Sequence, residues 1–261
     1  MRLPLYQVDA FTDHVFGGNP AGVVPLERWL ADATMQAIAA ENNLAETAFF
    51  VREGEGYALR WFTPTVEVDL CGHATLASAY VICDRLERGR KHVAFRTLKA
   101  GTLTVEKVGD EFVMDFPARP ARPIDAPSGI AEALGRRPTA LLAARDYLAV
   151  FDRAQDVAAL APDFDAIRRL DTFAVIATAP GSDGIDFVSR FFAPAQGVPE
   201  DPVTGSSHCT LTPYWAERLG KAKLRARQIS PRVGDLICEL RGERVAIAGK
   251  CVLYLEGTIA V

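Results

Sequence analysis

Two short stretches in this 261-residue chain combine small residues with side chains that can bind anions or move protons. Residues 69–75 read DLCGHAT and residues 200–206 read EDPVTGS, each with a glycine just before a helix-like run. The amino terminus of a helix exposes unpaired N–H groups and a positive dipole end, so it binds carboxylate or phosphate. Gly72 and Gly205 lack a Cβ and would let a ligand approach those N–H groups closely. The pattern predicts an anion site at each helix start, although two helix starts that only pack together would read the same way.

Four side chains in these stretches have chemistry of their own. His73 lies where the helix dipole favours neutral imidazole, and Cys71 lies where a depressed pKa would give a reactive thiolate. The Asp201 carboxylate can accept a hydrogen bond from a substrate amine or hydroxyl, and Ser206 can cap the helix and bind an oxyanion. Each also has an ordinary interpretation as a structural histidine, a small buried cysteine, a turn before proline or a helix cap.

Glu46 is the candidate general acid or base. It stands between Asn-Asn-Leu-Ala and the apolar residues 47–51. A carboxylate at the head of a buried strand is expected to have a raised pKa, which suits a group that shuttles a proton. The competing interpretation is that Glu46 caps a turn or pairs with an arginine.

The elements that must position these residues occur twice. Residues 60–68 and 190–198 share an arginine, a phenylalanine, a proline and a valine at the same places, 130 positions apart. In that register Cys71 falls on Asp201. Residues 45–51 resemble 170–176, and the hairpin pattern of 101–114 resembles that of 234–247. Two copies predict two similar lobes that face one cleft, each supplying half of a site.

The periodicity predicts the main elements. Strands are expected over residues 5–11, 21–25, 46–52, 57–62 and within 92–116, with an amphipathic helix over 31–42. Residues 72–86 are small and apolar nearly all round, which is typical of a buried helix. A second buried helix is expected from near Gly205 to a stop at Gly220.

These elements predict an α+β protein of two pseudo-symmetric lobes, each a mostly antiparallel sheet or barrel wrapped around a central helix. The first lobe is expected over residues 1–117 and the second over 128–250, joined by a proline-rich linker at 118–127. The apolar strand 251–261 has no counterpart in the first half, so we expect it to complete the first lobe.

Composition narrows the functional classes. Hydrophobic residues make up 49% of the chain, charged residues 24%, and the net charge of −4 includes no block of like charges, which argues against nucleic acid and membrane partners. The five cysteines are scattered, and no signal-peptide pattern begins the chain, so a cytoplasmic protein is expected. Since no GxGxxG, Walker A, HExxH or GxSxG motif is present, we expect chemistry without a cofactor or metal.

Four ordered motifs carry a resemblance to a known family. They are FGGNPAGV at residues 16–23, NLAETAF at 43–49, DLCGHATLA at 69–77 and DPVTGSSH at 201–208. The chain resembles the PhzF-like family of phenazine biosynthesis, within the diaminopimelate epimerase-like superfamily. The resemblance covers essentially the whole length and implies two lobes with the active site between them, a homodimer and no cofactor.

The same resemblance implies roles for individual residues. Glu46 matches the acid–base that moves a proton between carbons of a small cyclic carboxylate. His73, Asp201 and Ser206 match residues that hold the substrate or assist the transfer. Gly72 and Gly205 would supply backbone amides, and Asn19 would line the site.

These expectations favour a cofactor-independent isomerase that acts on a small carboxylate, similar to trans-2,3-dihydro-3-hydroxyanthranilate isomerase. One alternative is an amino-acid epimerase or racemase that uses Cys71 and Asp201 on opposite faces of a carbon, since the epimerase branch uses one cysteine from each lobe. A second alternative is a metabolite-binding protein without turnover.

Overall fold

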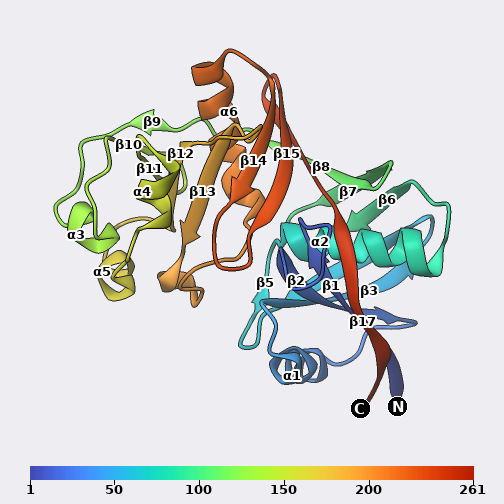
Figure 1. Cartoon of the computed structure of the whole chain (residues 1–261). Coiled ribbons are helices and arrows are strands. Elements are labelled where there is room, and N and C mark those ends of the chain that lie inside the picture. The colour runs from blue at the N-terminus through green and yellow to red at the C-terminus, as the bar shows by residue number, and fades with distance from the viewer. The chain divides into compact units, whose positions relative to one another are not determined.

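A computed structural model describes residues 1–261, and the chain divides into two compact units. The first comprises Met1–Asp115 together with Ala248–Val261, and the second comprises Phe116–Ile247. The returning segment belongs to the first unit through β17 (Cys251–Ala260), which pairs antiparallel with β1 (Arg2–Ala10). This pairing brings the two ends of the chain side by side (Figure 1).

The sheet of the first unit is mostly antiparallel. Its pairings run from β17 through β1, β2, β3, β4, β6 and β7 to β8, and the parallel pairs are β2–β3 and β4–β6. The remaining bounds are β2 (Asn19–Leu26), β3 (Glu46–Glu53), β4 (Gly56–Phe62), β5 (Glu67–Val68), β6 (His92–Arg96), β7 (Thr102–Val108) and β8 (Glu111–Pro117).

Helix α2 (Gly72–Tyr80) is the buried centre of the first unit. Every residue from the second to the eighth position of the helix is buried, and it packs against β1, β2 and β3 (Figure 1). The small, apolar residues that predicted a buried helix over 72–86 are therefore the ones that pack against this sheet. The last turns differ in detail, because Val81–Leu86 is π-helical and the Glu87 amide donates to the carbonyl of Ile82.

Helix α1 (Asp32–Asn42) covers another part of the same sheet. Met35 and Ile38 are buried on one face, as their spacing predicted, within an apolar cluster that also contains Phe49 and Phe62. The helix ends at Asn43, whose left-handed conformation stops it shortly before β3 begins.

The second unit repeats this plan with different details. Its strands are β9 (Arg122–Pro123), β10 (Ala140–Ala143), β11 (Tyr147–Val150), β12 (Val175–Pro180), β13 (Phe187–Phe192), β14 (Lys223–Gln228), β15 (Gly234–Arg241) and β16 (Arg244–Gly249), the last of which ends in the first unit. Pairings run from β9 through β10, β11, β12, β13 and β14 to β15, with β11–β12 and β13–β14 parallel. Short helices α3 (Ile130–Leu134), α4 (Ala154–Ala158), α5 (Phe164–Arg168) and the single turn η2 (Pro194–Gln196) connect them.

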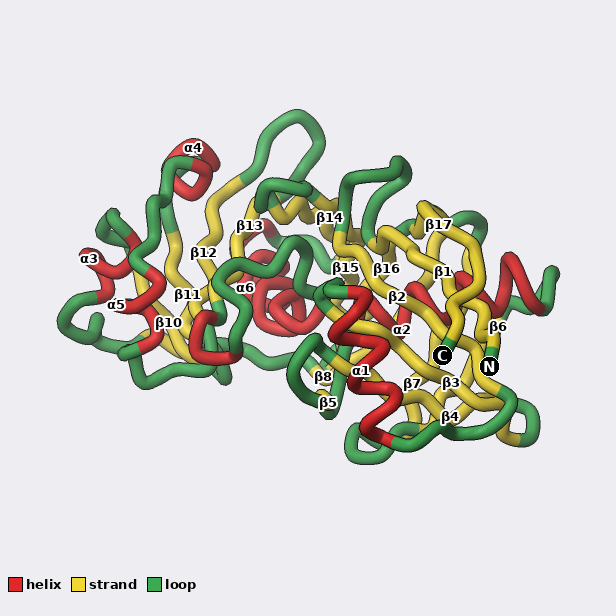
Figure 2. Tube along the Cα trace, turned by 90° about the horizontal axis from the view of Figure 1, so that it is seen from below, coloured by secondary structure: helices red, strands yellow, loops and turns green.

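Helix α6 (His208–Leu219) is the central helix of the second unit, preceded by a single 3₁₀ turn, η3 (Gly205–Ser207). Its Trp215 stacks on Phe187 of β13 at 5.7 Å and donates from Nε1 to the hydroxyl of Thr178 in β12 at 3.0 Å. Figure 2 shows α6 beside β13. The helix stops at Gly220, which has φ +67°, as the sequence predicted.

The α+β class, with a mostly antiparallel sheet around a central helix in each unit, is confirmed.

The proline-rich segment 118–127 is held to the second unit by backbone hydrogen bonds. The Ala118 amide donates to Glu243, the Arg119 amide donates to Cys209, and Arg122–Pro123 pairs with β10.

No helix of the protein is long and apolar enough to cross a membrane.

Candidate active site

Four of the predicted residues come together in the first unit. Glu46 is the first residue of β3, Asn19 is the first of β2, Cys71 is the cap residue before α2 and His73 is the second residue of that helix. The His73 Nε2 lies 3.1 Å from Glu46 Oε2. On the other side of the ring, Nδ1 lies 3.2 Å from Asn19 Nδ2 and 3.5 Å from Cys71 Sγ.

Local structure explains this convergence. Strands β2 and β3 are parallel and in register, with Ala21 opposite Glu46, so their first residues lie at one edge of the sheet. The glycines before β2 have a steric reason, because a Cβ on Gly18 would lie 2.1 Å from the Ala10 carbonyl oxygen. At Gly72 a Cβ would meet only the Met114 Cε, at 3.8 Å, so packing within the unit does not require glycine there.

The Glu46 carboxylate is largely buried, but its hydrogen-bonding capacity is not fully used. Its side chain is 16% exposed, and Oε2 is buried without a hydrogen bond of good geometry even though His73 Nε2 is close. A buried acceptor with unused capacity is costly in a merely structural role. The arrangement therefore leaves unused acceptor capacity on Oε2 beside His73.

The charges of this cluster differ from the sequence-based expectation. Burial by itself would raise the pKa of Glu46, but the charge of His73 and the polar contacts of His73 and Cys71 outweigh burial, so the pKa falls below its ordinary 4.5. The prediction of a raised pKa was wrong, because it considered burial without the neighbouring imidazole.

The expectation of a neutral His73 was also wrong. Burial opposes protonation of His73, yet the negative charges available at Cys71 and Glu46 raise its pKa well above 6.5. These negative charges, that of Cys71 being the larger, outweigh burial, and the helix-dipole argument had considered neither charge. Glu46 therefore lies beside a ring whose protonation it favours.

Cys71 is a thiol and not a thiolate in this state. Burial, followed by the charge of Glu46, raises the pKa of Cys71 to about 11. The depressed pKa considered for this cysteine was therefore wrong. The group can donate a proton at neutral pH but is a poor nucleophile until it loses that proton.

The predicted residues of the second unit lie on a braced turn. The Asp201 carboxylate accepts a hydrogen bond from the hydroxyl of Thr204, and Ser206 lies with Gly205 in η3. Gln228, fully buried, clamps the turn, because its Nε2 donates to the Asp201 carbonyl at 2.7 Å and its Oε1 accepts from the Thr204 amide at 2.9 Å.

Arg145 is a charged neighbour of this turn that the sequence did not reveal. Its Nη2 lies 3.4 Å from Ser206 Oγ, and its guanidinium forms a two-point ion pair with the buried Asp146. The guanidinium also lies 4.3 Å from the centre of the Phe173 ring. An Arg-Asp pair in a short loop has no distinctive spacing, so only the fold connects it with Ser206.

The starts of the two central helices carry the same kind of hydrogen bond, and this match corrects one position in the alignment of the sequence repeat. The Thr75 hydroxyl donates to the Cys71 carbonyl at 2.6 Å, and His208 Nδ1 lies 2.8 Å from the Thr204 carbonyl, in both cases four residues back. By this structural match the counterpart of Cys71 is Thr204, whereas the linear register placed Asp201 there. The sequence pattern gave no sign of the roles of Thr75, His208 and Gln228.

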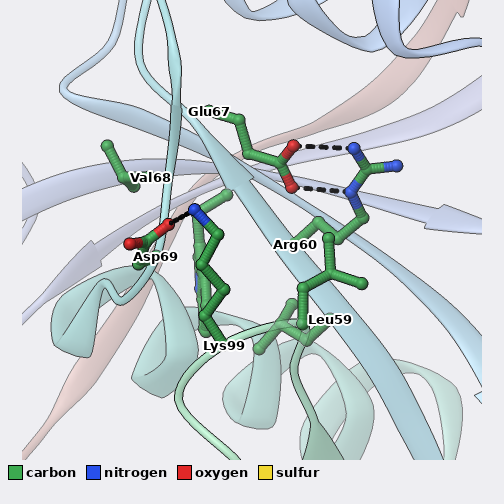
Figure 3. A pocket seen from close by; sticks show the side chains of 8 residues that line it. Leu59, Arg60, Glu67, Val68, Asp69 and Lys99 are labelled. Carbon is green, nitrogen blue, oxygen red and sulfur yellow. Dashed lines mark hydrogen bonds and ion pairs between the residues drawn. The ribbon is translucent and has the colours of Figure 1, made fainter.

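A surface pocket lies elsewhere in the first unit. Its lining includes Arg60, Glu67, Asp69 and Lys99 but none of the four clustered residues (Figure 3). Lys99 Nζ binds the Asp69 carboxylate at 2.8 Å, two residues before Cys71, and both side chains are largely exposed. This exposed ion pair joins Lys99 to the segment that leads into α2.

Comparison with known proteins agrees with the geometry. The model of a family described as phenazine biosynthesis-like protein matches residues 8–257. An uncharacterized isomerase of Pseudomonas aeruginosa is 52% identical over 259 residues, 99% of each chain. A crystal structure of a PhzF-family protein from Enterococcus faecalis has a TM-score of 0.97 at 45% identity, covering 100% of both chains. A hydroxyproline epimerase from Agrobacterium vitis shares the fold alone, with a TM-score of 0.62 at 10% identity over 100% of this chain and 93% of the other. The predicted diaminopimelate epimerase-like fold is confirmed.

Proposed function

Since the chain belongs to the phenazine biosynthesis-like protein family, we propose that it is an isomerase that moves a proton within a small cyclic or amino carboxylate. Several relatives that match 99% of the chain are named isomerases, which supports an isomerase-type enzyme. The reaction proposed is general acid–base catalysis without a cofactor, similar to that of trans-2,3-dihydro-3-hydroxyanthranilate isomerase.

The observation that carries the proposal is the buried Oε2 of Glu46 with unused acceptor capacity, 3.1 Å from His73, whose pKa is raised. Glu46 takes a proton from a carbon next to an electron-withdrawing group and returns it to another carbon of the same molecule. The imidazolium of His73 stabilises the negative charge that develops while the proton is on Glu46. The substrate neither gains nor loses atoms.

The remaining predicted residues are proposed to bind the substrate. In the first unit, Asn19 orients the His73 ring and Gly72 offers a backbone amide. In the second unit, Asp201, Ser206 and the amide of Gly205 serve this role, and Arg145 supplies a positive charge at Ser206. A homodimer and a biosynthetic role stay predictions from the family resemblance, and a cytoplasmic location stays a prediction from the cysteine pattern and the absence of a signal-peptide pattern.

The direct test is incubation of the purified protein in D₂O with trans-2,3-dihydro-3-hydroxyanthranilate, followed by NMR and ultraviolet spectra, beside a Glu46→Gln variant. Loss of the substrate diene with deuterium entering the product, in the wild type alone, is the expected result. Equal conversion by both proteins would overturn the role of Glu46. If neither converts this compound, the same exchange experiment with small amino and keto acids decides whether Glu46 moves protons at all.

A racemase that uses the Cys71 thiol is the second candidate, because Cys71 Sγ lies 3.5 Å from His73 Nδ1 in the same cluster. This candidate requires the thiol for turnover, whereas the proposed isomerase does not. A Cys71→Ala protein that remains active excludes the racemase. Loss of activity in that variant, with deuterium at an α-carbon in the wild type, would favour it.

A further inference from the structure

The cluster that is proposed to move protons also has the composition of a metal site. Glu46, Cys71 and His73 each offer one ligand atom, and these atoms all lie within 4.8 Å of one another. They come from two elements, the start of β3 and the start of α2, and Cys71 and His73 are buried. We propose that these three side chains bind one Zn²⁺ ion, and that the bound ion inhibits the enzyme.

The donor set fits zinc better than other common cations. A thiolate, an imidazole nitrogen and a carboxylate oxygen are the ligands that Zn²⁺ takes, whereas Mg²⁺ and Ca²⁺ require oxygen ligands. Zinc–ligand bonds of about 2.0 to 2.3 Å place tetrahedral ligand atoms roughly 3.3 to 3.7 Å apart. Here the His73 Nε2 is 3.1 Å from Glu46 Oε2 and 4.0 Å from Cys71 Sγ, so small side-chain rotations would complete the geometry.

The surroundings favour such an ion in two further ways. A Zn²⁺ ion bound by one carboxylate, one thiolate and a neutral imidazole has no net charge, so burying the complex avoids the cost of an isolated charge. The Asn19 amide lies 3.2 Å from His73 Nδ1, where its oxygen, once the amide is turned over, accepts the Nδ1–H and leaves Nε2 free for the metal. Metal-binding histidines usually donate the N–H of the other ring nitrogen to such an acceptor.

Inhibition follows from the lone pair that the ion would occupy. Oε2 of Glu46 is the oxygen that the proposed reaction leaves open for a substrate proton. Zinc bound there would remove the base, and three protein ligands leave a fourth position for water. The binding does not depend on the proposed isomerase activity; only its inhibitory effect does.

The test measures binding of the metal alone. Zn²⁺ is titrated into the purified protein in competition with a chromophoric chelator, and Co²⁺ is added separately to record its visible and near-ultraviolet spectrum. We expect one equivalent of Zn²⁺ and a cobalt spectrum with a thiolate charge-transfer band of a four-coordinate ion. Cys71→Ala should abolish that band, and both Cys71→Ala and Glu46→Gln should weaken zinc binding at least about tenfold.

Cys83→Ala is the matched control, since Cys83 is also buried in the first unit but lies in Val81–Leu86, outside the cluster. This variant should keep the stoichiometry, affinity and cobalt band of the wild type. The proposal is overturned if the wild type binds no zinc, or if Cys71→Ala and Glu46→Gln bind it as tightly as Cys83→Ala. Glu46→Gln is nearly isosteric, so it keeps the test decisive should the Cys71 variant fail to fold.

Discussion

The two units hold their central helices with matching parts but put different side chains at the helix starts. Arg60 donates two hydrogen bonds to the Glu67 carboxylate, from Nε and Nη2 at 2.7 Å, and Arg190 donates to Glu200 in the same way at 2.8 Å. Each guanidinium also lies over the phenylalanine two residues later, at 5.2 and 4.9 Å. The supporting contacts are duplicated, whereas the candidate chemistry is not.

The strand register shows which residue of the second unit occupies the position that Glu46 has in the first. Phe49 lies opposite the arginine in the first unit, and Ala177 lies opposite the arginine in the second. Counting back three residues from each places Ala174 where the first unit has Glu46. The sequence alignment had placed Asp171 there instead. A buried alanine at the matching position means that only the first unit retains an acid–base group on this strand.

The difference between the two units is tested most directly by removing the acid at each of the two aligned positions, Glu46 and Asp171. Glu46→Gln should lower kcat by about 10²- to 10⁴-fold, because it removes the base and keeps the shape. Ligand affinity should stay within roughly tenfold of the wild type. Asp171→Asn is the matched control, because Asp171 is exposed, and its kcat should be unchanged. Steady-state kinetics and a ligand titration on both variants decide; equal losses would refute the register.

The two buried histidines predict that the two units respond differently to pH. Burial lowers the pKa of His208 to about 4, whereas the pKa of His73 is raised above 6.5. Between pH 6.5 and 4 the unfolded chain protonates His208 and the folded chain does not, so His208 should cost up to about 3 kcal/mol of stability across this window. His73 acts in the opposite sense: its stabilisation is complete below pH 6.5 and is lost as the pH rises through its folded pKa.

His208→Asn tests this, since an asparagine amide can still donate to the Thr204 carbonyl but does not titrate. Denaturant unfolding at pH 7 and pH 4.5 should show a smaller loss of stability in the variant than in the wild type. If the variant loses as much stability between pH 7 and pH 4.5 as the wild type does, groups other than His208 govern stability at acid pH.

The sequence predicted the main elements and all four clustered residues, but not the direction in which the pKa values of Glu46, Cys71 and His73 shift. The helix patterns and four motifs located Glu46, His73 and Cys71 because those signals are local. The direction of each pKa depends on which groups meet across β3 and α2, and burial, dipole and thiol arguments made one residue at a time gave the wrong sign for all three. The Arg145–Ser206 contact spans 61 positions without a motif, so no local signal could find it.

The matching ion pairs predict unequal stability effects. Glu200 is 14% exposed and is the acid that binds Arg190, whereas Glu67 is 31% exposed and Arg60 also binds Asp32 at 2.8 Å. Glu200→Gln should therefore lower the free energy of unfolding by about 2 kcal/mol, because it leaves a buried guanidinium without its anion. Glu67→Gln should cost less than about 1 kcal/mol. Chemical denaturation of both variants measures the difference, and a larger effect at Glu67 would contradict it.

The smallest expected effect concerns the hydroxyl that holds the first helix start. Thr75 is buried, and its hydroxyl donates to the Cys71 carbonyl at 2.6 Å, as His208 does to Thr204 in the second unit. Thr75→Val keeps the shape and removes this bond, so it should cost about 1 kcal/mol of stability. Thr75→Ser keeps the donor and should restore most of the hydrogen bond while losing a methyl group. If the bond also fixes Cys71 beside His73, the valine variant should weaken Zn²⁺ binding more than the serine variant does. Equal zinc affinities would show that the hydroxyl stabilises the helix start without positioning the cluster.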